Sequence, residues 1–259
     1  MGALGFIDGR VVDLKELVIA MEDRGYQFGD GVYEYTKVYN GKLFSLKPHI
    51  DRLYRSLREL RIPAVFTFDE MAGIHERLIA ESGITNGGIY LQITRGWAPR
   101  AHNFPDAIVP CLTMTIRPSN FNAAQWDTGV GVLSVPDERW LRCDIKSLNL
   151  LANVLAKQKA KEAGCYEALQ IRDKMVTEGS SSNFFIVKDE PGSWKKSCRC
   201  TGCLSSKKRS RWNLRSAPMK RSSVVQRRRS CRLLRLTVNR WAAVRSARLP
   251  GRSKKRIKK

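Results

Sequence analysis

The last part of this 259-residue chain lacks acidic residues. Residues 191–259 contain no Asp or Glu, yet they hold 24 of the 47 Lys and Arg residues. Residues 1–190 carry 23 Lys and Arg against 24 Asp and Glu, so the formal net charge of +23 comes from the C-terminal segment. Because positive and negative charges nearly balance in the first 190 residues, that part of the chain gives no indication of a specific nucleic-acid partner.

Long apolar runs are absent as well. No stretch is long enough to span a bilayer, and an early acidic residue, Asp8, stands where a signal peptide would have its apolar core. We therefore expect no membrane partner and no signal peptide.

Cysteine is scarce in the first 190 residues, where it occurs singly as Cys111, Cys143 and Cys165. This usage is typical of free thiols in a reducing compartment and predicts a cytoplasmic location. A zinc site at the closely spaced 198, 200 and 203 cysteines is not expected, because no second pair follows at ligand spacing.

Residues 191–259 show no sustained hydrophobic period and mix Arg and Ser with Trp and four cysteines. Out-of-frame translation often gives such a mixture, so a frameshift is our hypothesis for this segment, and we expect it to be disordered. Basic runs at 207–209, 227–229 and 254–256 predict non-specific binding to polyanions with a steep salt dependence.

Patterns in residues 1–120 predict a small α+β domain. Asp8-Gly9 and Asn40-Gly41 are typical of hairpin turns, since both central positions of such turns require positive φ. Helices are expected after Pro48 and over 69–82, and strands over 89–94 and 112–116.

A linker over 118–125 is expected to lead into a second, incomplete domain over 121–190. There we expect strands over 130–135, 168–173 and 183–187, and a helix over 149–164 with Leu151, Val154 and Leu155 packed inward. Strands and helices do not alternate regularly, which favours the α+β class over a doubly wound sheet.

Three runs contain residues suited to chemistry. The first, Glu22 to Glu34, has three glycines in seven residues and then Tyr33. The second places Lys146 between a predicted strand and a predicted helix. A lysine in a partly dry site loses proton affinity and can attack an aldehyde to form a Schiff base.

The third run places Glu178 ahead of a glycine and of Ser180, Ser181 and Ser182. A buried glutamate can hold a proton on a pyridine nitrogen, and N–H and O–H groups can donate to a phosphate. Taken singly, each run is also typical of a surface loop, a solvated lysine or a serine-rich turn.

Together, the strings EDRGYQFGDGVYE, HIDRLYRS, WLRCDIKSLN and TEGSSSN resemble the fold-type-IV pyridoxal-phosphate (PLP) enzymes, also called the D-amino acid aminotransferase-like family. The resemblance covers residues 4–190. It implies a two-domain α+β fold, pyridoxal 5'-phosphate as cofactor, and a homodimer.

The resemblance also implies roles for individual residues. Lys146 would form the Schiff base with the cofactor and carry the proton, Glu178 would pair with the pyridine nitrogen, and Arg52 would bind the phosphate. Tyr33 and Arg139 would border the cofactor. Ser180, Ser181 and Ser182 would offer further donors.

The substrate class rests on the segment from Arg95 to His102, which resembles a loop of the D-amino acid transaminases. By that resemblance Arg100 and His102, with Tyr33, would hold the substrate carboxylate, across the dimer interface in the family, and His49 matches another polar position. An arginine presents a two-pronged donor that fits a carboxylate. The implied reaction exchanges the amino group of a D-amino acid, such as D-alanine, with a 2-oxo acid, such as 2-oxoglutarate.

Two alternatives stay open. Branched-chain aminotransferases and aminodeoxychorismate lyases share the lysine and glutamate but generally lack the Arg-x-His pair. An inactive remnant is the other alternative, because the phosphate-binding helix and Ser/Thr-rich loop of the family do not follow Glu190. Weak retention of PLP, or none, is therefore expected.

Overall fold

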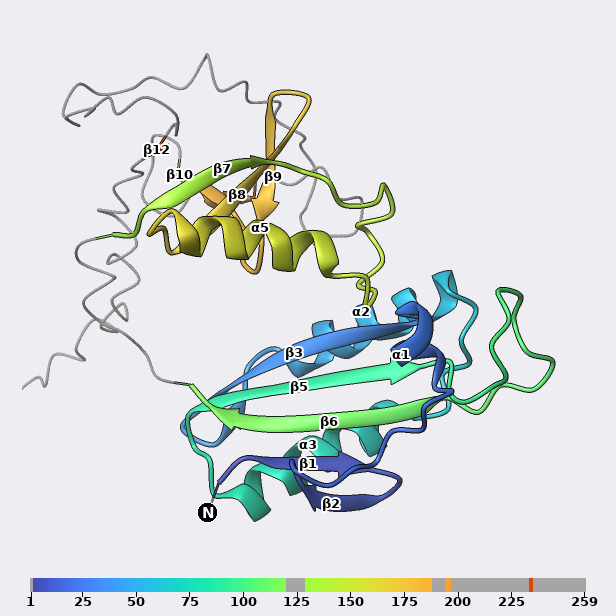
Figure 1. Ribbon diagram of the computed structural model, residues 1–259. Coiled ribbons are helices and arrows are strands. Elements are labelled where there is room, and N and C mark those ends of the chain that lie inside the picture. The colour runs from blue at the N-terminus through green and yellow to red at the C-terminus, as the bar shows by residue number, and fades with distance from the viewer. Residues whose placement is uncertain (1, 120–128, 188–193, 197–232, 235–259) are drawn as a thin grey trace, which may run out of the picture.

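The structure is a computed structural model that describes residues 2–119, 129–187, 194–196 and 233–234. It has two parts, a six-stranded sheet covered by two helices and a smaller sheet with one helix (Figure 1). The predicted domain boundary at residue 120, most of the predicted linker, the basic runs and the closely spaced cysteines lie outside the described residues.

The large sheet is antiparallel throughout, in the order β2-β1-β6-β5-β3-β4. Its strands are β1 (Leu4–Ile7), β2 (Arg10–Asp13), β3 (Gly31–Tyr39), β4 (Lys42–Leu43), β5 (Gly87–Thr94) and β6 (Cys111–Pro118). Both predicted hairpins are confirmed, with φ of 49° and 77° at Asp8 and Gly9 and of 48° and 75° at Asn40 and Gly41.

Two helices, α2 (Leu46–Glu59) and α3 (Phe68–Ser82), pack on one face of this sheet. Thr67 and Glu70 form a reciprocal capping box at the start of α3, which satisfies backbone N–H groups that have no partner within the helix. The core between helices and sheet is aliphatic and contains Val32, Ile50, Leu53, Leu57, Met71, Leu78, Ile89, Leu91, Met114 and Ile116.

The second part contains a parallel crossover. Strands β7 (Val132–Pro136) and β8 (Glu167–Arg172) are parallel and are joined through α5 (Leu151–Glu162). The antiparallel neighbour of β8 is β9 (Met175–Gly179), that of β7 is β12 (Leu233–Leu234), and β10 (Phe185–Val187) pairs with β11 (Trp194–Lys196). An antiparallel sheet beside one crossover confirms the α+β class.

The prediction for the packing of α5 was wrong. Leu151, Val154 and Leu155 are 72%, 58% and 50% exposed in the described structure, whereas Ala156 and Ala160 are buried against the small sheet. The buried face of α5 consists of small side chains, so the larger side chains on its other faces point away from the sheet. In the described part of the chain, no helix has the length and apolar character needed to cross a membrane.

His75 in α3 predicts acid sensitivity. Its Nδ1 lies 2.6 Å from the carbonyl oxygen of Met71, and its buried Nε2 has no hydrogen-bond partner among the described residues. Burial lowers the pKa of His75 from 6.5 to about 4. Between these values the unfolded chain binds a proton that the folded chain does not, so stability is lost as the pH falls from 6.5 towards 4.

We expect this effect to cost about 2 kcal/mol of unfolding free energy between pH 7 and pH 5. Urea unfolding at both pH values measures it, with His75→Leu as the comparison, because leucine cannot titrate. The same pH dependence in both proteins would show that His75 is not responsible.

Candidate active site

The segment that joins β7 to α5 pairs with the edge of β3. The backbone N–H of Tyr33 donates to the carbonyl oxygen of Lys146 at 2.9 Å, and that of Leu148 donates to the carbonyl oxygen of Gly31 at 3.0 Å. β4 pairs with the far end of β3, at Val38 and Tyr39, which leaves this end of the strand edge to the segment. These two bonds bring Lys146 from the small-sheet part to the large sheet.

The side chain of Lys146 points at Tyr33. Its Nζ donates to the Tyr33 hydroxyl at 3.2 Å and lies 4.3 Å from the centre of the Tyr33 ring. That ring stacks on Tyr90 with 5.6 Å between centroids, and the Lys146 backbone N–H donates to Ser56 at 3.2 Å. Lys146 is therefore held at both ends, by the hydrogen bond of its backbone N–H and by that of its side-chain amine.

A buried carboxylate holds Arg52 beside this amine. Nε and Nη2 of Arg52 donate to the two oxygens of Glu34 at 2.6 and 2.8 Å, and His49 Nδ1 lies 2.9 Å from the same carboxylate. Burial alone would raise the pKa of Glu34, but its hydrogen bonds to Arg52 and His49 outweigh burial and lower it. The result is a fixed guanidinium in the wall of the pocket.

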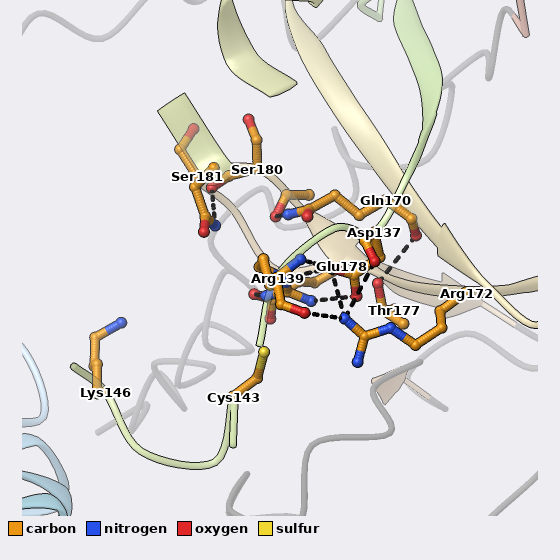
Figure 2. Close-up of polar contacts among 12 residues, drawn as sticks. Asp137, Arg139, Cys143, Lys146, Gln170, Arg172, Thr177, Glu178, Ser180 and Ser181 are labelled. Carbon is orange, nitrogen blue, oxygen red and sulfur yellow. Dashed lines mark hydrogen bonds and ion pairs between the residues drawn. The ribbon is translucent and has the colours of Figure 1, made fainter. Parts of the chain in front are cut away.

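Glu178 on β9 belongs to a second group of ion pairs (Figure 2). Arg139 pairs with Glu178 through Nη1 and with Asp137 through Nε, and Arg172 also contacts Asp137. In Figure 2, Cys143 lies between this group and Lys146. Burial favours a higher pKa for Asp137, but bonds from Arg139 and Thr177 lower it.

One pocket brings five of the predicted site residues together: Tyr33, Arg52, Arg139, Lys146 and Glu178. The remaining lining residues are Trp140, Cys143, Asp144, Ile145, Ser147, Asn149, Leu150, Asn153 and Asn183. A primary amine, a guanidinium and a carboxylate that share one pocket can hold an aldehyde, an anion and a protonated ring nitrogen, respectively.

The model of the family described as amino-transferase class IV matches residues 31–191. The chain belongs to the class-IV aminotransferase family. It is 47% identical over 181 residues to a D-alanine aminotransferase from Bacillus licheniformis, an alignment that covers 70% of this chain and 64% of that relative. The chain thus spans less than two thirds of the length of this relative.

Solved structures show the same fold. A branched-chain amino acid aminotransferase from Escherichia coli superimposes with a TM-score of 0.65 at 19% identity, covering 73% of this chain and 66% of that one. A hypothetical aminotransferase from Mycobacterium tuberculosis, solved in a PLP-bound form, has a TM-score of 0.60 at 20% identity. The superposition covers 72% of this chain and 68% of that one.

In this class-IV aminotransferase chain, the three predicted serines turn to Glu167 and are not among the residues that line the described pocket. Hydroxyls of Ser180, Ser181 and Ser182 all donate to the Glu167 carboxylate, the last two at 2.8 and 2.9 Å. Burial would raise the pKa of Glu167, but these bonds lower it. Their role as phosphate donors stays a prediction.

The predicted carboxylate-binding pair also lies elsewhere. Arg100 stands over the ring of Phe28 at 4.4 Å, and the ring of His102 lies 5.4 Å from the same ring. Both residues are exposed, and neither is among the residues that line the described pocket. His49, predicted as a substrate contact together with Tyr33, Arg100 and His102, pairs with Glu34.

Sequence reasoning missed the buried cluster that joins the glycine-rich run to the Arg95 loop. Asp30 accepts hydrogen bonds from Arg24 at 2.8 Å and from Nε and Nη2 of Arg95 at 2.8 and 2.9 Å. The same glycine-rich run contains a short helix, α1 (Arg24–Phe28), between an Asp23 cap and a left-handed Gly29. A local sequence pattern cannot show that Asp30 pairs with Arg95, because the two residues are 65 positions apart. The signal that the sequence did offer was the mixture of acidic and basic residues beside the glycines.

At Gly31, the Lys146 segment packs so closely against β3 that there is no room for a side chain. A Cβ at Gly31 would lie 2.6 Å from the carbonyl oxygen of Ile93 and 2.8 Å from Leu148 Cδ1. We expect Gly31→Ala to destabilise the protein by about 1–3 kcal/mol, because a backbone atom has to move. Urea unfolding measures this cost.

Gly73 is the matched control, because it is exposed within α3 and a Cβ there meets nothing within 4 Å. Gly73→Ala should stabilise the protein by about 0.5–1 kcal/mol through helix propensity. Equal effects of the two substitutions would contradict the tight fit at Gly31.

Proposed function

We propose that this chain carries the active-site residues of a PLP-dependent D-amino acid transaminase. It would exchange the amino group of a D-amino acid, such as D-alanine, with a 2-oxo acid, such as 2-oxoglutarate. The observation that carries the proposal is the Lys146 amine, 3.2 Å from the Tyr33 hydroxyl in a pocket that also holds Arg52 and Glu178. The 47% identity to a D-alanine aminotransferase supports the substrate class.

The donor set of the pocket fits PLP. Lys146 would take the aldehyde carbon, Arg52 the phosphate, and Glu178 the ring nitrogen, with Tyr33 and Arg139 at the borders. When bound, PLP supplies an electron sink for negative charge at the substrate α-carbon. The Mycobacterium tuberculosis aminotransferase, which has the same fold, was solved with PLP bound, and the residue roles proposed here rest on the pocket of this chain.

The residues of the pocket divide the work of proton transfer. Once the amino donor has displaced it from the aldehyde carbon, Lys146 Nζ would remove the α-proton of that donor and return it at C4′, the former aldehyde carbon, which is general acid–base catalysis by one amine. Tyr33 would orient that amine through its hydroxyl. Glu178, which forms an ion pair with Arg139, would hold the proton on the ring nitrogen.

The substrate carboxylate would be bound by Arg100 and His102 of a second copy. In one described chain these residues lie against Phe28 and not in its own pocket, which supports a role across a homodimer interface. Cys111, Cys143 and Cys165 form no disulfide within the described residues, which is compatible with the proposed cytoplasmic location.

The two alternatives rest on different observations. The similarity to the branched-chain enzyme, at 19% identity, is evidence of fold alone. The remnant alternative draws on the serines that turn to Glu167 and on the family match that ends at residue 191. We therefore propose that the chain retains PLP weakly or not at all, so the assay has to contain added PLP.

A coupled assay with D-alanine, 2-oxoglutarate and added PLP tests the proposal, run beside L-branched substrates. We expect turnover with D-alanine, and we expect Lys146→Ala to abolish both turnover and the absorbance band of bound PLP, because the described residues that line the pocket include no second lysine. Lys161→Ala, on the exposed side of α5, should change neither.

Full activity of Lys146→Ala would refute the role of this lysine. A preference for L-branched substrates would favour the branched-chain alternative. Absence of turnover, with only the spectrum of free PLP, would favour the remnant.

A further inference from the structure

Asp137 lies behind Arg139, on the side away from Lys146 (Figure 2). Its side chain is 1% exposed, and its two oxygens accept from Nε and Nη2 of Arg139 at 2.8 and 2.9 Å. These two nitrogens form the fork with which a guanidinium binds both oxygens of one carboxylate.

Arg172 anchors Asp137 in turn. Its Nη2 lies 3.2 Å from Oδ1 of Asp137 and donates to the backbone carbonyl oxygens of Asp137 and Arg139 at 3.2 and 2.7 Å. The four charges of Asp137, Arg139, Arg172 and Glu178 sum to zero. Removing the charge of Asp137 would leave a net positive charge beside Glu178.

Because Nε and Nη2 of Arg139 bind Asp137, Arg139 contacts Glu178 through its remaining nitrogen. Arg139 reaches Oε1 of Glu178 with Nη1, the nitrogen outside the fork. Arg52 shows the alternative in the same pocket, because there the Nε and Nη2 fork takes both oxygens of Glu34 at 2.6 and 2.8 Å. Without Asp137, the fork of Arg139 could bind Glu178 in the same way.

We propose that Asp137 is a positioning residue that keeps the Nε and Nη2 fork of Arg139 away from Glu178, so that the Glu178 carboxylate can also accept the N–H of a protonated pyridine ring. The inference rests on the proposed function. It assigns to Asp137 a specific effect on recognition of the ring nitrogen, and not on the phosphate or the aldehyde.

Equilibrium dialysis with two ligands isolates that effect. One ligand is PLP, and the other is its isostere with C–H in place of the ring nitrogen, which cannot donate to Glu178. We expect Asp137→Asn to reduce the preference for PLP over the isostere about tenfold, as for the loss of one hydrogen bond to a charged group. Thermal unfolding, followed in parallel, reports any general loss of stability.

Three further variants complete the test. Asp51→Asn also removes one negative charge, but from an exposed pair with Lys47 on α2, and should leave the preference unchanged. Glu178→Gln should abolish the preference. Asp137→Asn in the Glu178→Gln background should then reduce it no further, since residues that act through one another are not additive.

The outcomes separate the two proposals. Equal weakening of both ligands in Asp137→Asn would overturn the inference and leave the proposed function intact. A further loss of preference in the double variant would overturn it as well. Failure of the unaltered chain to bind either ligand at millimolar concentration would contradict the proposed function itself, and with it the inference.

Discussion

Two backbone hydrogen bonds on one strand edge determine where the chemistry of this protein can occur. They run between β3 and the segment around Lys146, and they join residues that are more than 110 positions apart in the chain. An exposed strand edge offers unpaired N–H and C=O groups, and here those groups select the segment that carries the amine. Tyr33 and Lys146 face each other as a consequence of this pairing.

Carboxylate–guanidinium pairs fix the two arginines of the pocket and, outside the pocket, the loop that starts at Arg95. Glu34 fixes Arg52, Asp137 fixes Arg139, and Asp30 joins Arg24 to the loop that starts at Arg95. A buried carboxylate is costly unless it is paired and hydrogen-bonded, so each pair restricts its arginine to few orientations. The acidic residues therefore set the direction in which each guanidinium points, and they can do so without contacting a substrate.

The sequence allowed the two hairpin turns, β5, β6 and α3 to be predicted from local patterns, and the family resemblance named the five residues that the structure brings into one pocket. It did not allow β9 to be predicted, since the run around Glu178 has the composition of a serine-rich turn. The direction of the Ser180 to Ser182 hydroxyls depends on Glu167, which is on another strand. Leu151, Val154 and Leu155 were expected inside because periodicity identifies an apolar stripe but not which face meets the sheet.

Alanine on the inner face of α5 has a consequence for the shape of the pocket. Ala156 and Ala160 set the distance between the helix and the small sheet, since interiors are close-packed and a methyl group is the smallest spacer that a side chain offers. Asn153 lies one turn away, lines the pocket and donates to the carbonyl oxygen of Ser180 at 2.8 Å. Ala156 and Ala160 do not line the pocket, but they hold the helix that carries Asn153, so we expect a single added methylene there to move this wall of the pocket.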